Sequence, residues 1–428
     1  MTVPAPGPAS RHEPTDAILV ETARQLEHWR LALERLAAPE TLASPASWQF
    51  LEHYLGVALR ATINTATERL RSRIATLAAA LDRSGPNDAA RLRAELLRVR
   101  QHYLRLETMI EFYADALATR AVEPMGSWLR ACDHLATRAM AEILTPLGLQ
   151  VPAVLTFADK GSGAAIWKMG LRLWDGTIEN PVAVIKVTRH NLLRPTATLH
   201  EAGHQIAHVL GWNTELRDAL ANGLQPRLGP LAQVWAGWAS EIAGDAFAFC
   251  HTGFGAVSAL HDVVDGDDDA VFFLMPGDPH PVAHLRVLLG VAMCRRAFGA
   301  GGWDRLAEAW TDAHPGSGID AGTRELIERS LPALDQIAGL TLYRPYRAFR
   351  GRSLADLIDP RRVSPSALDT LERDLGQGGL HSRHWIWDEA IRILALTSYR
   401  ATRDAASLRQ SVLQQDAVMR RLGLKRAA

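Results

Sequence analysis

The sequence predicts an α+β protein in which helices predominate, with a small β-sheet in the middle of the chain and helical segments on both sides. Apolar residues recur at helical spacing through most of residues 18–147, and again from Gly301 to the end. Between these regions, three short segments rich in β-branched and aromatic residues follow Val151. The 428 residues are 47% hydrophobic and 22% charged, which is typical of a globular protein with a sizeable core.

The chain is expected to divide into four parts. Residues 1–17 are rich in Pro, Ala and Ser and have the composition of a flexible tail. Residues 18–147 contain four predicted helices that form a bundle, and one of these helices ends at the breaker Ser84-Gly85-Pro86-Asn87. Residues 148–300 are expected to form the domain that contains the sheet, and residues 301–428 a C-terminal helical domain.

Residues 148–300 are predicted to contain three strands followed by helices. The strand segments are 152–159, 164–174 and 182–190, and Asp175-Gly176 between the second and third is a hairpin signal. Helices are predicted at about 196–210, 232–252 and 282–299, with an acidic loop before the last of them. These helices bring the chemically informative residues next to the sheet.

Charge and cysteine content exclude several classes of function. Lys plus Arg and Asp plus Glu both number 47, so charge gives no argument for binding nucleic acid or an anionic membrane. Cys132, Cys250 and Cys294 form no C-x-x-C pair and predict neither a disulfide framework nor a cysteine zinc site. The start of the chain lacks the apolar region of a secretory signal, and the apolar stretch 228–260 contains charged residues. We therefore expect a cytoplasmic protein without a membrane span.

The strongest chemical signal is the H-E-x-x-H motif at residues 200–204. Pro195 and Thr196 can start a helix there, and positions four apart lie on one helical face about 6 Å from each other. The imidazoles of His200 and His204 can therefore reach one metal ion. Glu201 lies beside them, where it can take a proton from a water molecule at the metal.

A third metal ligand is needed for a catalytic zinc site. His208 lies about 12 Å along the helix from His200 and cannot share its ion. Leu210 occupies the position where a metzincin has its third histidine. The remaining candidate is Glu241, which lies in an otherwise apolar predicted helix. Burial of a carboxylate there costs free energy unless the group is paired or bound to a metal. Asp245 lies one turn later and can accept the free N–H of a ligating histidine.

This pattern, HEAGH followed by EIAGD on a second helix, resembles that of the gluzincins, the thermolysin-like clan of zinc metallopeptidases. The resemblance covers roughly residues 150–290. It implies a zincin-like catalytic core, with Zn²⁺ held by three residues and two more residues assisting. The implied ligands are His200, His204 and Glu241, the implied general base is Glu201, and the implied partner of His200 is Asp245.

Two sequence differences from thermolysin-like enzymes concern the residues around the metal. Ser240 stands where an asparagine often precedes the third ligand, and no tyrosine lies between the two helices to stabilise the oxyanion. The segment 278–286 is similar to an H-P-x-x-x-x-R element found after the third ligand in some gluzincins. By this resemblance, His280 or Arg286 stabilises the negative charge of a tetrahedral intermediate. The alternative is a loop and helix cap with a structural arginine.

The sequence therefore predicts a zinc metallopeptidase that binds a peptide or protein substrate. The peptide is expected to align along an edge strand, at residues 164–174 or 182–188. Two alternatives remain open. Two histidines and a carboxylate also describe the iron site of non-haem oxygenases. The site can also stabilise a non-catalytic binding or regulatory protein.

Overall fold

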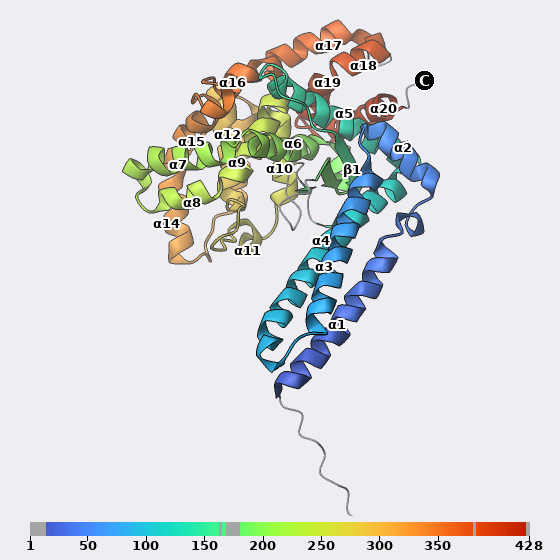
Figure 1. Ribbon diagram of the computed structural model, residues 1–428. Coiled ribbons are helices and arrows are strands. Elements are labelled where there is room, and N and C mark those ends of the chain that lie inside the picture. The colour runs from blue at the N-terminus through green and yellow to red at the C-terminus, as the bar shows by residue number, and fades with distance from the viewer. Residues whose placement is uncertain (1–13, 162–164, 168–179, 380–381, 425–428) are drawn as a thin grey trace, which may run out of the picture. The chain divides into compact units, whose positions relative to one another are not determined.

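The computed structural model describes residues 14–161, 165–167, 180–379 and 382–424. These residues form a predominantly helical structure with one three-stranded sheet (Figure 1), which confirms the predicted mostly helical α+β class. Within the described residues, none of the helices is both long and apolar enough to cross a membrane. The expected hairpin turn at Asp175-Gly176 lies outside the described residues.

The chain folds as two compact units. The smaller unit comprises residues 1–117 and 171–181, and the larger unit comprises residues 118–170 and 182–428. The helices that begin in the smaller unit are α1 (Pro14–Leu36), α2 (Pro45–Leu55), α3 (Leu59–Leu81) and α4 (Ala89–Arg120), with short 3₁₀ turns η1 (Pro39–Thr41) and η2 (Pro86–Asp88). Helix α1 begins within the expected tail, because proline fits the first turn of a helix.

The long helices α1, α3 and α4 lie side by side (Figure 1). Trp29 of α1 packs on Tyr103 of α4, with ring centroids 5.1 Å apart. Arg73 of α3 forms an ion pair of 3.2 Å with Glu95 of α4. Apolar residues at helical spacing on each of the three helices are buried, as expected for amphipathic helices.

The larger unit contains the sheet and the remaining helices. Its strands are β1 (Val154–Ala158), β2 (Ala165–Trp167) and β3 (Ala183–Val187). Its helices are α5 (Met125–Leu144), α6 (Thr196–Val209), α7 (Trp212–Leu228), α8 (Leu231–Gly237), α9 (Ala239–Thr252), α10 (Phe254–Val264), α11 (Asp268–Val271), α12 (Ala283–Phe298), α13 (Gly302–Ala313), α14 (Ala321–Ser330), α15 (Leu334–Leu342), α16 (Leu354–Leu357), α17 (Pro365–Gly379), α18 (Arg383–Asp388), α19 (Ala390–Arg400) and α20 (Ala405–Leu422). Its 3₁₀ turns are η3 (His190–Leu193), η4 (Leu331–Ala333), η5 (Arg347–Phe349) and η6 (Pro360–Val363).

The sheet has the strand order β1–β3–β2. Strand β3 pairs in parallel with β1, so that Thr156 lies opposite Ile185, and antiparallel with β2, so that Ile166 lies opposite Ile185. Of the two segments expected as an edge strand, 182–188 is therefore wrong, because β3 is hydrogen-bonded on both sides. Strand β2 is an edge of the described sheet, and most of the remaining segment 164–174 lies outside the described residues.

A buried ion pair connects β1 to helices α4 and α5. Asp133 of α5 accepts hydrogen bonds from the backbone N–H of Thr156 at 2.6 Å and from the Arg120 guanidinium at 2.7 Å. Arg120 also donates to the carbonyl oxygen of Thr156 at 2.7 Å. Both side chains are at most 9% exposed, so this ion pair holds the sheet with little contact with bulk water.

The division into units differs from the expected boundaries at residues 147 and 300. Helix α5 packs on β1, α6 and α20. One continuous cluster of buried apolar residues extends from Leu129 to Leu422 and joins the sheet region to the C-terminal helices. Apolar periodicity identifies helix faces but does not say which partner a face will meet.

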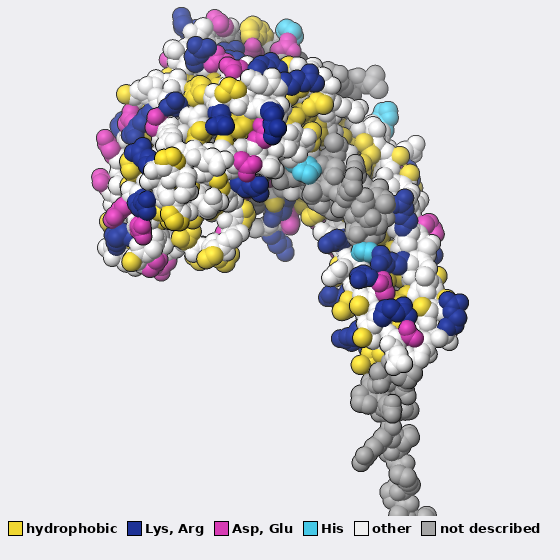
Figure 2. Space-filling model, turned by 60° about the vertical axis from the view of Figure 1, so that its left-hand side comes forward, with side chains coloured by type: hydrophobic (Ala, Val, Ile, Leu, Met, Phe, Trp, Pro, Cys, Tyr) yellow, Lys and Arg dark blue, Asp and Glu magenta, His cyan; other side chains and the backbone are white. Residues whose placement is uncertain are grey.

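Basic and acidic side chains are interspersed over the face of the larger unit shown in Figure 2. This distribution agrees with the equal numbers of acidic and basic residues in the sequence.

Candidate metal centre

Helix α6 carries the H-E-x-x-H motif and crosses α9 at two glycines. A Cβ atom at Gly203 would lie 2.8 Å from the Cβ atom of Phe247, and a Cβ atom at Gly244 would lie 2.7 Å from Cε1 of His200. Both distances are too short for any larger residue without a shift of the neighbour. The glycines therefore let the two helices approach closely enough for their polar side chains to meet.

For a zinc ion held by side chains at this crossing, we expect Gly244→Ala to weaken binding about 10- to 100-fold, as does loss of a residue that orients a metal ligand. The added methyl group must displace the imidazole of His200. Competition with a chromogenic chelator measures the affinity, and circular dichroism checks the fold. Gly237→Ala is the matched control, because a Cβ atom there meets nothing within 4 Å. Equal zinc affinity in the two variants would contradict the close contact between α9 at Gly244 and the imidazole of His200.

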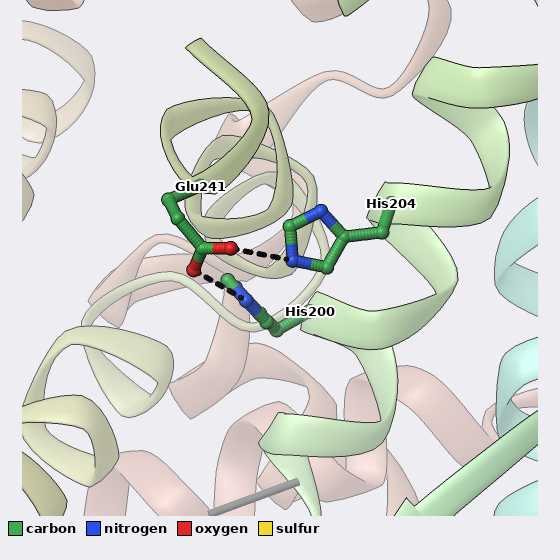
Figure 3. Close-up of side chains that lie close together, drawn as sticks. All are labelled: His200, His204 and Glu241. Atoms are coloured by element: carbon green, nitrogen blue, oxygen red, sulfur yellow. Dashed lines mark ion pairs between the residues drawn. The ribbon is translucent and has the colours of Figure 1, made fainter. Parts of the chain in front are cut away.

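Three side chains from these two helices converge on one point (Figure 3). The carboxylate of Glu241, in the first turn of α9, faces both imidazoles of α6. Its Oε1 lies 3.1 Å from Nε2 of His204, and its Oε2 lies 3.4 Å from Nε2 of His200. One nitrogen or oxygen atom of each of the three residues lies within 4.8 Å of the others. The spacing is that of atoms that can share an ion.

The other ring nitrogens of the two histidines also have partners. Asp245 lies 2.9 Å from Nδ1 of His200, and the Ser240 hydroxyl lies 3.2 Å from Nδ1 of His204. When each Nδ1–H donates to its oxygen, each Nε2 keeps its lone pair free and faces Glu241. Both imidazoles are therefore oriented for coordination through Nε2.

Arg286 of α12 joins the two carboxylates of α9. Its Nε donates to Oδ2 of Asp245 at 2.7 Å, and its Nη2 donates to Oδ1 of Asp245 at 2.8 Å and to Oε2 of Glu241 at 3.1 Å. This bidentate geometry fixes both carboxylates in place. The guanidinium thus contacts both carboxylates of α9 at once and also lines the cavity that contains them.

The pKa values reflect this concentration of charge. Burial alone would lower the pKa of His200, but hydrogen bonds to Asp245 and Glu241 outweigh burial and raise the pKa to about 10. Burial would raise the pKa of Glu241, yet His200, His204 and Arg286 together hold it far below its usual value. The cluster therefore favours positive charge, which either protons on the imidazoles or a cation between the side chains supplies.

Glu201 and His280 lie at the same site but outside the three-residue cluster. Glu201 is 5% exposed. Burial lowers the pKa of Arg286, but the neighbouring carboxylates, Glu201 among them, outweigh burial and raise that pKa above its usual value. Nε2 of His280 lies 3.7 Å from Oε2 of Glu241. Its Nδ1 lies 2.7 Å from Asp278, which also accepts the backbone N–H of His280. Asp278 thus turns Nε2 of His280 towards the cluster.

A cavity of about 1010 Å³ connects these residues. Its lining includes the three clustered side chains together with Glu201, Asp245, His280 and Arg286, and also Ala165 and Ile166 of strand β2. The edge of the sheet and the polar cluster therefore open into the same space.

The structure brings together all seven residues singled out from the sequence: His200, Glu201, His204, Glu241, Asp245, His280 and Arg286. The contacts of Ser240 with His204 and of Asp278 with His280 were not predicted from the sequence. Ser240 precedes Glu241 and Asp278 lies two residues before His280, so the signal was a polar side chain next to a predicted site residue. Comparison of the chain with protein-family models, curated proteins and solved structures found no match.

Proposed function

We propose that this protein is a zinc-dependent metallopeptidase with a zincin-like core of the gluzincin type. The observation that carries the proposal is the convergence of His200, His204 and Glu241 on one point inside a cavity that also contains Glu201 and the edge of a sheet. The gluzincin resemblance provides an analogy for this arrangement, and the geometry of these side chains supports it.

The donor set fits a divalent zinc ion. Catalytic zinc is bound by three protein ligands at about 2.0–2.2 Å, which places neighbouring ligand atoms about 3.4 Å apart in a tetrahedron. The separations of 3.1 and 3.4 Å between Glu241 and the two imidazoles agree with this spacing. With neutral imidazoles, the carboxylates of Glu201, Glu241 and Asp245 exceed the charge of Arg286 by two, which a divalent cation balances.

Each side chain of the site has a distinct task in the proposed hydrolysis. Zinc, when bound, lowers the pKa of a water molecule and polarises the scissile carbonyl group. Glu201 accepts a proton from the attacking water and later delivers it to the leaving amine. The imidazolium form of His280 donates a hydrogen bond from Nε2–H to the oxygen that becomes negative, while its Nδ1–H donates to Asp278, which holds the ring in that orientation. Arg286 is a positioning residue, because it fixes Glu241 and Asp245.

Strand β2 offers a place for the peptide backbone. The strand is an edge of the described sheet, so one side of its backbone is not paired with β3. Ala165 and Ile166 line the cavity that contains the cluster. A substrate strand added to this edge would lie beside the three proposed ligands and Glu201.

Metal analysis of the purified chain tests the proposal. We expect about one zinc ion per chain in the wild type and loss of most of it in His204→Ala, because a catalytic site has only three protein ligands. His208→Ala is the matched control, since His208 lies one turn later on α6 and outside the cluster. Bound iron with oxygen-dependent turnover would instead favour a non-haem oxygenase. Zinc that survives in His204→Ala would contradict the assigned ligands.

A further inference from the structure

Helix α4 of the smaller unit (Figure 1) has an exposed side that carries apolar residues. Its buried side chains recur at helical spacing, as expected for one side of an amphipathic helix: Leu92, Leu96, Val99, Tyr103 and Leu106. Leu97 is instead 44% exposed, and Leu104, seven residues later, is partly exposed. Because residues seven apart share a helical face, these two leucines lie in one row on the outer side of α4.

This outer side of α4 has the heptad pattern of a coiled-coil seam. Leu97 and Leu104 take position d of the heptad. Position a then falls on three exposed residues: Ala94, Gln101 and Thr108. In a coiled coil, a second helix covers positions a and d. Among the described residues these positions remain at least partly exposed, so the seam is open to a second helix.

Arginines follow the seam on both sides. Position e is occupied by Arg91, Arg98 and Arg105, and position g by Arg93 and Arg100. All five side chains are exposed. Residues 89–105 contain these five arginines, one glutamate and no lysine. The neutral total charge of the chain therefore includes a local excess of positive charge along the outer side of α4.

Most of these guanidinium groups are available to a partner. Arg91 pairs with Asp88 at 2.7 Å and Arg98 pairs with Glu95, but every side chain in these two pairs is at least 32% exposed. Exposed pairs of this kind contribute little to stability and exchange easily. Within the part of the chain that the structure describes, three of the arginines form neither a hydrogen bond nor an ion pair: Arg93, Arg100 and Arg105.

We propose that the outer side of α4, from Arg91 to Thr108, docks an acidic amphipathic helix of a partner protein. A helix whose leucines pack on Leu97 and Leu104 brings its own positions e and g beside the arginine rows. Glutamate or aspartate at those positions can form bidentate pairs with the guanidinium groups. Both helices repeat about every 10.5 Å, so the charges stay in register along the seam. This inference is independent of the proposed peptidase activity.

The leucines decide between a protein helix and a nucleic acid as the occupant. A phosphate backbone would also pair with the arginines, but it would leave Leu97 and Leu104 uncovered between the two rows. A helix with an apolar seam covers the leucines and neutralises the arginines together. The combination of both features therefore favours the acidic helix.

Fluorescence anisotropy with the full-length chain tests the charge complementarity. The probe is a labelled peptide with three repeats of Glu-Leu-Ala-Ala-Leu-Glu-Gln, and its counterpart has Lys in place of Glu. We expect only the acidic peptide to bind, and Arg93→Glu combined with Arg100→Glu to weaken binding at least about tenfold. Arg24→Glu combined with Arg35→Glu is the matched control, because it makes the same change of charge at exposed positions of α1. Equal binding of the two peptides, or equal loss in the two double variants, would overturn the inference.

A second set of measurements tests the helical seam and the other occupants. Leu97→Gln should weaken binding of the acidic peptide about fivefold with unchanged helicity. Leu31→Gln is the matched control, because Leu31 is 49% exposed on α1. A 20-nucleotide thymidine strand that binds more tightly than the peptide, or a Leu97→Gln variant that binds like the wild type, would contradict the helix. A dimer in light scattering that Arg93→Glu with Arg100→Glu abolishes would assign this side of α4 to a second copy and overturn the inference.

Discussion

Glu201→Gln is expected to lower kcat for peptide hydrolysis by about 10²- to 10⁴-fold, the usual contribution of a general base. Glutamine has the same shape as glutamate but cannot accept a proton from water at neutral pH. Glu201 lies on α6 between the proposed ligands His200 and His204, and it lines the same cavity. It is not part of the three-residue cluster that these histidines form with Glu241. Its loss should therefore remove proton transfer and leave zinc binding intact.

Two measurements decide this prediction: turnover of a peptide that the wild type cleaves, and zinc content of the same samples. Glu308→Gln is the matched control, since Glu308 is exposed on α13 and does not line the cavity. A Glu201→Gln variant that keeps full peptidase activity would remove the residue from the mechanism. A variant that loses zinc as well would indicate that Glu201 supports the metal site itself.

Asp133→Ala should lower the free energy of unfolding of the larger unit by about 3–5 kcal/mol, the usual cost of breaking a buried ion pair. The carboxylate of Asp133 is 5% exposed. It receives hydrogen bonds from both the Arg120 guanidinium and the backbone of Thr156. Alanine leaves the guanidinium charge and this backbone N–H of β1 without that partner inside the protein. Such groups cannot recover their hydration without opening the structure.

Urea unfolding, followed by far-ultraviolet circular dichroism, measures this loss. Asp218→Ala is the matched control, because Asp218 is 59% exposed and its ion pair with Arg217 lies on the surface. Exposed pairs contribute about 1 kcal/mol or less, so the control midpoint should hardly move. Equal midpoints for Asp133→Ala and the wild type would show that Arg120 and β1 find other partners.

The sequence predicted the motif helix closely. The expected helix at about 196–210 corresponds to α6, Thr196–Val209, with His200 and His204 one turn apart. The expected helix at 232–252 is instead two helices, α8 and α9, separated at Trp238. This break places Glu241 in the first turn of α9, where the helix dipole favours a carboxylate. Apolar spacing alone did not show the break, because the pattern continues across it.

Local signals were sufficient wherever the relevant contacts lie within one helix turn or one strand. The mostly helical fold class, the strand segments around β1 and β3, and the common face of the two motif histidines all follow from such contacts. Helical and strand periodicities are properties of neighbouring residues, so the sequence by itself determined them.

Only the tertiary structure decided which of these faces meet. In the fold, Ser240 and Asp278 each contact a histidine nitrogen. Arg286 contacts two carboxylates of α9, and β3 lies in the centre of the sheet. The fold also joins the last helix to the cavity wall through Leu408. These contacts depend on the shape of complementary surfaces far apart in the chain, and in particular on the close crossing at Gly203 and Gly244. Their physical basis is close packing, which a one-dimensional pattern does not encode.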